Sequence, residues 1–436
     1  MESLWQSLSA IPEFPCLSGD AKTDVLVIGG GLAGILTAYC LQKKGIDTML
    51  VEKDRVCSAV TAGTTAKITA QHGLIYHKIL KSYGVEHAQM YYAAYTQGVE
   101  TLKELCRSAG CRLEEKDNFV YSTDGKRLDA ELSALQQLKI PAKTIRDLPF
   151  GVEAAGAVGF ENQGQFDPRS LACYLTKELR VYENTKVREL IGTEAVTEYG
   201  KIKAKKIVVA THFPFLNKHG GYFLKLYQHR SYMLAMQNVD ALDGMYVDED
   251  KKGFSFSSFD GYLLLGGGSH RTGKQSGSYR ELRGFAERHV PAARERFHWA
   301  TQDTMSLDGI PYIGHYSRNT PDLYVATGFN KWGMTGSMVS ARLLSSIMVG
   351  ETVDYAPVFS PSRSILKPQL LINGFESVKN LLTPTVPRCP HLGCALHYNK
   401  EEHSWDCACH GSRFSETGEV LDNPATADLK RTKDST

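Results

Sequence analysis

The stretch of sequence that decides the fold is residues 24–53, which read DVLVIGGGLAGILTAYCLQKKGIDTMLVEK. An apolar run, a glycine turn, a helical segment and a second apolar run follow one another, which predicts strand, turn, helix and strand. The turn places Gly29, Gly31 and Gly34 in the spacing G-x-G-x-x-G. Here the first glycine makes the tight turn, the second lets the backbone approach a pyrophosphate, and the third lets the helix pack against the strand. Glu52 ends the second strand, where a carboxylate can accept ribose hydroxyls, so the stretch predicts a Rossmann-like dinucleotide site.

Two later segments have the pattern of further strands from the same sheet. The IVVA run at 207–210 suits a buried parallel strand, and PDLYVATGF at 321–329 is another that runs into a glycine turn and a helix. Between them, residues 222–270 alternate like strands and predict an antiparallel sheet. We therefore expect the nucleotide-binding part to be assembled from separated pieces of chain, with another domain inserted between them.

Composition and charge narrow the class of protein. The chain has 436 residues, which at roughly 150 residues per domain suggests two or three domains. Its net charge of +2 offers no basic surface for nucleic acid and no polybasic membrane anchor. The apolar stretch at residues 25–41 is just short of a membrane span, and the N-terminus lacks the features of a signal peptide. The sequence predicts a cytoplasmic protein with no transmembrane segment and no nucleic-acid partner.

These motifs together resemble the flavin-dependent amine and amino-acid oxidoreductases of the D-amino-acid oxidase and glycine oxidase class. The matching stretches are residues 24–41, VEKD at 51–54, IVVATH at 207–212, DGIPYIG at 308–314 and ATGFNKWGMTG at 326–336. The resemblance implies FAD, not NAD, as the cofactor held by the fingerprint, and we predict that this FAD is bound noncovalently. It also implies an α/β fold in which an FAD-binding Rossmann-like domain carries an inserted α+β substrate domain.

The resemblance further implies which residues contact the flavin. The loop at 61–67 is expected to run under the flavin, and the helix that begins near Gly333 would point the positive potential of its N-terminus at the flavin ring. Beyond the three fingerprint glycines and Glu52, the predicted cofactor-binding residues are Thr64, Thr65, Lys67, Gly328, Gly333, Met334 and Thr335.

Candidate catalytic side chains are predicted beside these segments. Lys331 and Trp332 border the glycine turn, and His72 follows the flavin loop. Arg230 and Tyr232 lie in the expected substrate sheet, where an arginine could hold a substrate carboxylate bidentately. These five are the predicted catalytic residues; packed core or ion-paired roles are the alternative for the histidine and the arginine.

Four of the ten cysteines crowd into residues 389–409 together with histidines. The segment reads CPHLGC at 389–394 and CACHGS at 407–412, which is C-x-H followed by C-x-x-H with one further cysteine on each loop. In a chain predicted to be cytoplasmic, such a cluster indicates a metal site before it indicates disulfides. Two cysteines and two histidines also suit tetrahedral zinc, but zinc leaves the extra pair of cysteines unexplained.

The segment closely resembles a Rieske iron–sulfur module of the disulfide-bearing type. The resemblance implies a [2Fe–2S] cluster in a small all-β domain, a disulfide, and two pairs of ligands. Its ligands would be Cys389 and Cys407 on one iron and His391 and His410 on the other, with the disulfide between Cys394 and Cys409. Neutral imidazoles in place of two thiolates lower the negative charge of the cluster and raise its potential.

Two details of the module depart from this family. Phe414 stands where high-potential modules have a tyrosine that donates to a cluster sulfur, whereas the serine donor is retained as Ser412. Few residues separate the proline-rich stretch 355–369 from Cys389, so the module looks shortened before its first ligand loop.

The assignments give a predicted division of the chain. The FAD-binding part would comprise residues 1–75, 170–212 and 300–352, and the substrate domain 76–169 and 213–299. A linker would occupy 353–383, and the Rieske domain 384–436.

Three functions fit these motifs. The first is an FAD-dependent dehydrogenase of a small amine or amino acid that passes electrons through the Rieske cluster to an external one-electron acceptor protein or quinone. The second is an NAD(P)H-dependent flavin reductase that feeds the fused cluster, which requires a second nucleotide fingerprint. The best candidate, Gly266–Gly268, lacks the third glycine. The third is a non-enzymatic metal-binding scaffold, which two cofactor motifs in one chain disfavour.

Overall fold

The fingerprint stretch folds as predicted in the computed structural model, which describes residues 2–250, 253–274, 278–384 and 387–429. It forms strand β1, helix α2 (Leu32–Lys43) and strand β2, with β1 and β2 parallel. Strands β10 and β17, the two later apolar runs, join the same sheet in parallel. In spatial order the sheet is β16 (Tyr312–His315), β17 (Leu323–Thr327), β10 (Lys201–Val209), β1 (Ala21–Ile28), β2 (Thr48–Val51) and β7 (Arg180–Tyr182), with β9 (Glu194–Val196) on β10 and β8 (Glu189–Ile191) on β9.

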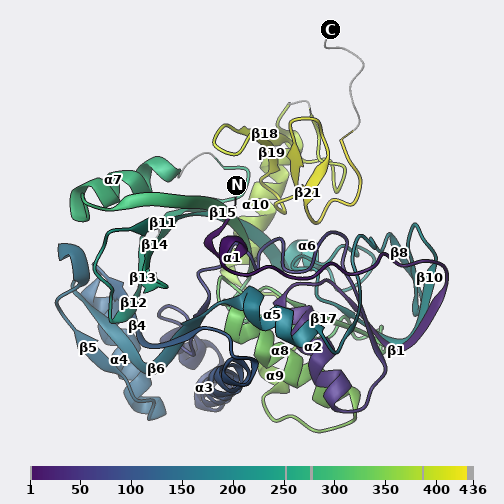
Figure 1. The fold of residues 1–436 in the computed structure, drawn as a ribbon, viewed down its shortest axis with the longest axis horizontal. Helices are drawn as coiled ribbons and strands as arrows, with labels where there is room; N and C mark the ends of the chain where they lie inside the picture. The colour runs from purple at the N-terminus through teal and green to yellow at the C-terminus, as the bar shows by residue number, and fades with distance from the viewer. Residues whose placement is uncertain (1, 251–252, 275–277, 385–386, 430–436) are drawn as a thin grey trace.

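A second, nine-stranded sheet forms the inserted part of the molecule (Figure 1). Its pairs are antiparallel, as predicted for residues 222–270, except that β12 and β4 run parallel. In spatial order it comprises β15 (Arg294–Ser306), β11 (Leu226–Gln237), β14 (Tyr262–Arg271), β13 (Ser255–Phe259), β12 (Gly244–Asp248), β4 (Leu113–Ser122), β6 (Gly156–Phe166) and β3 (Lys67–Ile68), with β5 (Lys143–Ile145) on β6. Because β15 belongs to this sheet, residues 300–306 lie apart from the parallel sheet to which the predicted division assigned them.

Helices cover both sheets. Helix α2 packs against α8, and α8 packs against the long helix α3, whose Tyr91 and Tyr95 lie in the core. Besides α2, the described helices in the body are α1 (Leu4–Leu8), α3 (Tyr76–Ala109), α4 (Gly125–Leu138), the 3₁₀ turn η1 (Pro149–Gly151), α5 (Pro168–Thr176), α6 (Tyr222–Lys225), α7 (Tyr279–His289) and α8 (Gly333–Met348).

A small antiparallel sheet at the C-terminal end sits on the body, at the top of Figure 1. Its strands follow one another in chain order as β18 (Leu396–Asn399), β19 (Ser404–Cys407), β20 (Arg413–Ser415) and β21 (Val420–Asp422). The cysteine–histidine loops lie before β18 and between β19 and β20. Residues 385–386 and 430–436 of the predicted Rieske domain lie outside the described residues.

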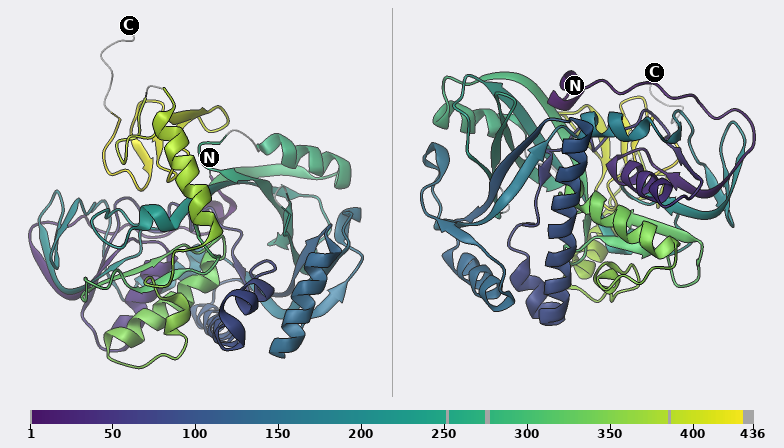
Figure 2. Two further views of the ribbon diagram at one scale, coloured as in Figure 1. Left: turned by 180° about the vertical axis from the view of Figure 1, so that it is seen from behind. Right: turned by 60° about the horizontal axis from the view of Figure 1, so that its bottom comes forward.

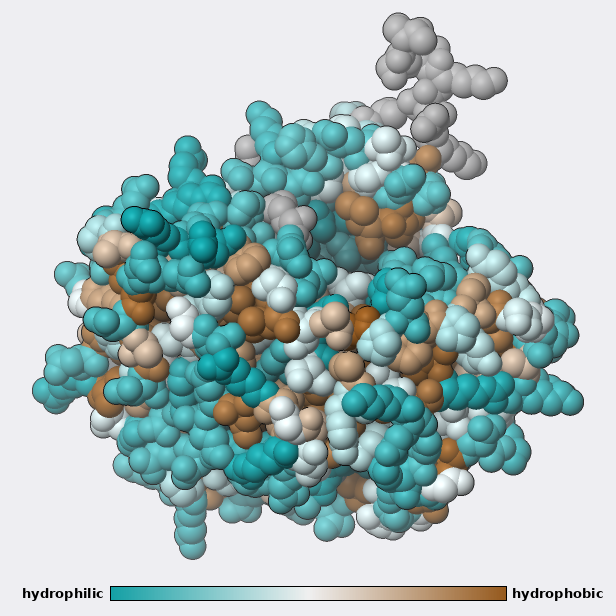
Figure 3. Space-filling model, viewed as in Figure 1, coloured by the Kyte–Doolittle hydropathy of each residue, from teal (hydrophilic) through white to brown (hydrophobic). Residues whose placement is uncertain are grey.

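The stretch predicted as a linker is largely helical. It contains α9 (Ala356–Phe359) and α10 (Pro368–Leu382), and α10 runs along the back of the molecule toward the C-terminal sheet (Figure 2, left). The face of α10 that meets the protein is polar, with Asn373, Glu376 and Asn380 buried. Its apolar side chains, among them Leu371 and Phe375, are exposed. The opposite side of the molecule, drawn in Figure 3, is mainly hydrophilic, with apolar side chains scattered over it.

Candidate cofactor sites

A cavity of about 340 Å³ lies where the carboxyl ends of the parallel strands meet one face of the second sheet. This end of an open α/β sheet is where nucleotides bind. Its walls come from the glycine turn, the loop at 58–67, strands of both sheets and the start of α8. Lining residues include Gly29, Gly31, Glu52, Thr61, Thr64, Thr65, Lys67, Thr211, His212, Ser231, Met233, Ser269, Asp303, Lys331, Trp332, Gly333 and Met334.

The three fingerprint glycines have the separate roles that their spacing predicts. At Gly29 (φ +113°) a Cβ would lie 2.5 Å from the carbonyl oxygen of Ala210, so the turn admits no side chain. At Gly34 a Cβ would lie 1.9 Å from the carbonyl oxygen of Gly29, which fixes how closely α2 packs on the turn. At Gly31 the nearest atom is Thr61 Oγ1 at 3.4 Å, and the space beyond is the cavity. The turn is therefore a cradle that a side chain at Gly31 would fill, which fits a bound pyrophosphate.

Glu52 fixes the glycine turn from the end of β2. Its carboxylate accepts hydrogen bonds from the backbone N–H groups of Gly30 at 2.6 Å and Asp54 at 3.0 Å. Burial raises the pKa of Glu52, while these two donors act in the opposite direction. Glu52 also lines the cavity, where a ribose hydroxyl could donate to its carboxylate.

Polar side chains from three strands and the turn meet beside the start of α8. Lys331 Nζ donates to Ser231 Oγ at 3.1 Å and to Ser269 Oγ at 2.5 Å. Burial lowers the pKa of Lys331 and the nearby Asp303 carboxylate raises it, although the side chain is open to the cavity itself. Burial in turn raises the pKa of Asp303, and Lys331 lowers it. Sequence reasoning identified Lys331 but missed Ser231, Ser269 and Asp303; only the pairing of their strands with the Lys331 turn brings them together.

The loop under this cavity contains a buried lysine. Lys67 faces the cavity from β3, and burial lowers its pKa to about 7. The carbonyls of its neighbours are held from outside, because Trp5 Nε1 donates to Thr64 at 2.7 Å and Gln165 Nε2 donates to Thr65 at 2.8 Å. The loop is therefore fixed in place with Lys67 directed at the cofactor space.

Several predicted site residues lie elsewhere. On β11, Ser231 and Met233 line the cavity, so Arg230 and Tyr232 point to the opposite face of the sheet because successive side chains alternate. Arg230 forms a buried ion pair with Glu402 of the C-terminal module in place of the predicted substrate contact.

His72, Gly328 and Thr335 are also behind the cavity wall. The Nδ1 atom of His72 lies 2.7 Å from the Tyr91 hydroxyl oxygen, and its ring lies 5.2 Å from that of Trp332, so it supports the wall from behind. Thr335 Oγ1 accepts from the backbone N–H of Thr69 at 2.9 Å, and Gly328 packs against Leu226.

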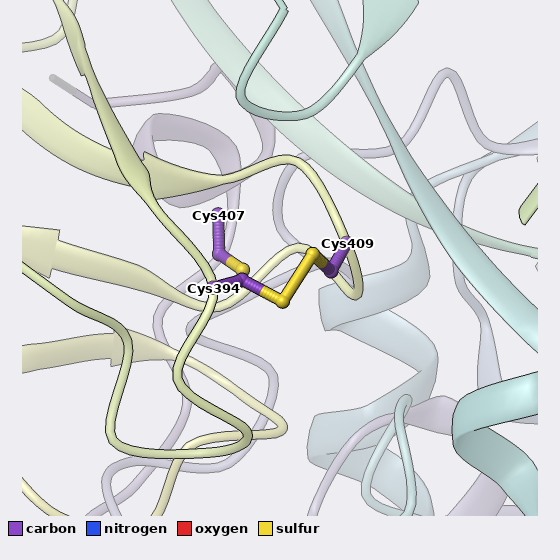
Figure 4. Close-up of side chains that lie close together, drawn as sticks. All are labelled: Cys394, Cys407 and Cys409. Carbon is purple, nitrogen blue, oxygen red and sulfur yellow. A yellow bond between two sulfur atoms is a disulfide. The ribbon is translucent and has the colours of Figure 1, made fainter. Parts of the chain in front are cut away.

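The cysteine–histidine loops form a second, separate site. Cys394 and Cys409 form the expected disulfide, which ties the two loops together. The Cys407 sulfur lies within 4.8 Å of both disulfide sulfurs (Figure 4). The Cys407 thiol donates to Cys389, which lowers the pKa of Cys389 to about 7, and the Ser412 hydroxyl acts in the same direction. Two buried sulfurs that share a proton in this way are prepared to bind metal as thiolates.

The two histidines complete the site. Nδ1 of His391 and Nδ1 of His410 are buried and have no hydrogen-bond partner within the described part of the chain. Their rings lie 4.9 Å apart, and burial lowers the pKa of His391 to about 4 and that of His410 to about 3. Neutral imidazoles with free, buried nitrogens suit metal ligation. The residues present therefore fit a cluster held by Cys389, Cys407, His391 and His410.

The module is joined to the body through buried polar contacts. Arg271 donates to the backbone carbonyls of Ala408 and Cys409 at 2.9 and 3.0 Å. Asn423, from the loop after β21, lines the cavity described above and donates to the carbonyls of Thr211 and Phe213 at 3.3 Å. The C-terminal module thus forms part of the cavity wall.

Comparisons with known proteins agree with both sites. Residues 24–347 match the DAO family, described as FAD dependent oxidoreductase, and residues 372–433 match the Rieske [2Fe-2S] domain. The chain is 33% identical over 494 aligned residues to the putative Rieske 2Fe-2S iron-sulfur protein YhfW of Bacillus subtilis (strain 168), covering 99% of this chain and 97% of that protein. It is 22% identical to gamma-glutamylputrescine oxidoreductase of Escherichia coli (strain K12), covering 78% of this chain and 86% of that protein.

Solved structures show the same fold. L-proline dehydrogenase from P. horikoshii superposes with a TM-score of 0.66 at 18% identity, covering 79% of this chain and 98% of that chain. Glycine oxidase from Geobacillus kaustophilus superposes with a TM-score of 0.65 at 20% identity, covering 79% of this chain and all of that chain.

The fold and the two sites define a flavoprotein oxidoreductase with an iron–sulfur module on its C-terminal side. The chain belongs to the DAO family of FAD-dependent oxidoreductases and carries a Rieske domain. Its cofactors are accordingly FAD and a [2Fe–2S] cluster, as the sequence predicts, and the zinc alternative is set aside. None of the helices in the described residues is long and apolar enough to span a membrane.

Proposed function

We propose that the protein is a dehydrogenase of a small amine or amino acid that passes electrons from flavin through the Rieske cluster to an external one-electron acceptor. The observation that carries this proposal is the placement of the module, which contributes Asn423 and Thr426 to the wall of the flavin cavity. Relatives whose names include gamma-glutamylputrescine oxidoreductase, L-proline dehydrogenase and glycine oxidase support a nitrogen-bearing substrate.

Oxidation of an amine needs a neutral nitrogen beside the flavin. With FAD bound, the flavin would take a hydride from the substrate carbon while the nitrogen lone pair forms the C=N bond of an iminium ion. The proton that the chain must remove is therefore the one that an arriving ammonium group carries. A bound cluster would pass the two electrons on singly, each to one molecule of a one-electron acceptor protein or quinone. When bound, the flavin and the cluster supply this redox chemistry; the chain positions the substrate and handles its protons.

Lys331 is the candidate for handling the proton. Its Nζ lies on the cavity wall at the start of α8, fixed by Ser231 and Ser269 and paired at longer range with Asp303. Because burial lowers its pKa, Lys331 can accept the proton of an arriving ammonium group. Trp332 beside it forms an apolar part of the same wall. We propose Lys331 and Trp332 as the substrate-contacting residues.

The alternative is a flavin reductase that takes electrons from NAD(P)H. Strand β14 contains the triple glycine, Gly266–Gly268, but it continues as a strand and leads into no helix at that point. A nucleotide pyrophosphate would therefore lack the helix N-terminus that such sites use. This feature favours the amine dehydrogenase.

An anaerobic absorption experiment separates the two functions. Purified holoprotein is mixed in turn with a panel of primary and secondary amines, amino acids and NADH, and the flavin and cluster absorbances are followed. We expect at least one amine or amino acid to bleach the flavin and then the cluster. Stoichiometric bleaching by NADH with none by any amine would establish the reductase. Lys331→Met should slow the bleaching by the amine, whereas Lys205→Met, at an exposed lysine of the parallel sheet, should not.

We also propose where the protein is located in the cell and that it does not bind nucleic acid. The near balance of charge, at +2, supports a protein free of nucleic acid. We propose a cytoplasmic location, which cell fractionation with a membrane-protein marker would test.

A further inference from the structure

We propose that the two imidazoles of the Rieske module have separate roles. The loop that contains His410 packs on the face of the second sheet opposite the flavin cavity and marks the inlet for electrons. His391 lies at an exposed edge and marks the outlet toward an acidic one-electron acceptor protein. This inference rests on the proposed function, because it assigns a direction to the same electron path.

The inlet side is packed tightly against the body. His410 is only 4% exposed, and its ring is hydrogen-bonded to the backbone of Phe223. Gln228 Nε2 donates to the His410 carbonyl at 3.1 Å, and Gln302 Nε2 donates to the Gly411 carbonyl at 2.9 Å. A Cβ at Gly411 would lie 2.5 Å from the Gln228 Cβ, so the loop approaches the sheet as closely as a glycine allows.

A single sheet separates this loop from the flavin cavity. On β15, Gln302 reaches the module while its neighbours Thr301 and Asp303 line the cavity. On β11, Gln228 likewise reaches the module while Ser231 lines the cavity. Successive side chains alternate across a strand, and layers packed on a sheet lie roughly 10 Å apart. The His410 loop and the flavin therefore occupy the two faces of one layer.

The outlet side is different. His391 is partly exposed, and its Nε2 lies 2.9 Å from Oδ1 of Asn217, a residue that is itself exposed. Beside His391, Leu392 is 42% exposed. The edge is made of residues 217–219 and 388–393, which meet at the contact between His391 and Asn217.

The charge of this edge indicates its partner. Its formal charges are Lys218, with 80% of its side chain exposed, and the exposed Arg388; neither segment contains an acid. The nearest acid paired with Lys218 is Glu189, at 3.6 Å and exposed to solvent. A basic rim around a partly exposed ligand and an apolar Leu392 complements an acidic protein surface. Each transfer moves one electron and makes or breaks no bond.

The outlet can be tested without a substrate. The full-length holoprotein is reduced with dithionite, freed of excess reagent, and mixed by stopped flow with either an acidic blue-copper protein or a basic c-type cytochrome. We expect Lys218→Glu to slow oxidation of the cluster by the acidic acceptor about tenfold at low ionic strength, and to speed oxidation by the basic one. Lys205→Glu is the matched control, since its side chain is 78% exposed and also pairs with one acid.

The outlet assignment would be overturned if Lys218→Glu and Lys205→Glu changed the rate of cluster oxidation equally with both acceptors. The outlet would also be overturned if a water-soluble quinone oxidised the cluster faster than either protein and if Leu392→Asp reduced that rate. The edge would then bind a quinone and not a protein. Since no amine is used, failure of the proposed substrate class leaves this result unaffected.

The inlet assignment is tested by measuring electron transfer from the flavin to the cluster. Light-driven reduction of the flavin, followed by freeze-quench EPR, measures transfer to the cluster. We expect Gln302→Leu to slow this transfer while leaving the oxidation of a pre-reduced cluster by the acidic acceptor unchanged; the reverse pattern would overturn the inlet.

Asn217 is a positioning residue at the outlet. As an acceptor from the His391 ring it makes the imidazole more electron-donating, so Asn217→Ala should raise the cluster potential and Asn217→Asp should lower it. No shift, or shifts of the same sign, would show that Asn217 does not act on His391.

Discussion

At Gly31 a side chain would enter the flavin cavity, whereas at Gly34 it would strike the chain itself. We therefore expect Gly31→Val to fold and load its cluster but to lose FAD, because the valine occupies the space of the pyrophosphate. Flavin and iron content of the purified variant measure this directly. Gly284→Val is the control, since a Cβ there meets nothing within 4 Å. Wild-type flavin occupancy in Gly31→Val would show that the pyrophosphate lies elsewhere.

The buried side chain of Lys67 should make the stability of the flavin-free protein depend on pH. Burial lowers its pKa to about 7, so between pH 7 and the usual lysine range the unfolded chain binds a proton that the folded chain does not. Stability of the flavin-free protein should then rise with pH across this window. Lys67→Met should reduce the slope, to which Lys225, with its pKa lowered by burial to about 8, also contributes, and should stabilise the protein near pH 7 by on the order of 4 kcal/mol. Urea unfolding at several pH values between 7 and 10 tests it; an unchanged slope in the variant contradicts it.

Hydroxyl donors near the cluster set its potential. Ser412 donates toward Cys389, while Phe414, fully buried among the module's cysteines, offers no hydroxyl. Donors to the sulfurs stabilise the more negative reduced cluster. We expect Ser412→Ala to lower the potential and Phe414→Tyr to raise it, as measured by redox titration with EPR. No upward shift in Phe414→Tyr would mean that this side chain does not reach the cluster.

At the scale of elements, helix α10 reverses the usual arrangement of polar and apolar faces. Asn373 Oδ1 accepts from Arg271 Nη1 at 2.8 Å on the buried face, whereas Leu371 is 78% and Phe375 69% exposed. Asn373→Ala leaves a buried guanidinium N–H without its acceptor and should cost about 1–3 kcal/mol of stability. Leu371→Gln and Phe375→Gln should change stability by less than about 0.5 kcal/mol. Thermal unfolding of the three variants tests this, and a large loss in Phe375→Gln would mean that the apolar face is covered.

Strand β11 shows what a sequence pattern leaves undecided within an element. Its alternation predicts a strand with two distinct faces, and that prediction is confirmed. Which face meets the flavin depends on the layer packed on each side. The cavity lies against Ser231 and Met233, so Arg230 is left for the ion pair with Glu402.

At the scale of the whole molecule, one buried cluster of charges holds the Rieske module on the body. Glu402 pairs with Arg230 of β11 and with Arg413 of β20, at 2.8 Å for the second contact, and all three side chains are less than 10% exposed. Glu402→Gln leaves Arg230 without a counter-charge, and breaking such a pair costs about 3–5 kcal/mol. We expect calorimetry to show a separate, earlier transition for the module. Arg230→Met combined with Glu402→Gln should recover part of the loss; no recovery would mean that the pair does not couple the two parts.

The sequence by itself determined the elements that are encoded locally. Spacing sets the glycine turn, since a Cβ at Gly34 would meet the carbonyl of Gly29 within the same strand–turn–helix unit, and C-x-H with C-x-x-H brings cysteine and histidine onto two short loops. Only the tertiary structure decided the contacts between distant segments. Lys331 meets Ser231, Ser269 and Asp303 because four separate pieces of chain converge on one cavity. The face of β11 that meets the flavin, the inverted face of α10 and the burial of His410 follow from how layers pack, and no local periodicity records which layer will cover a given face.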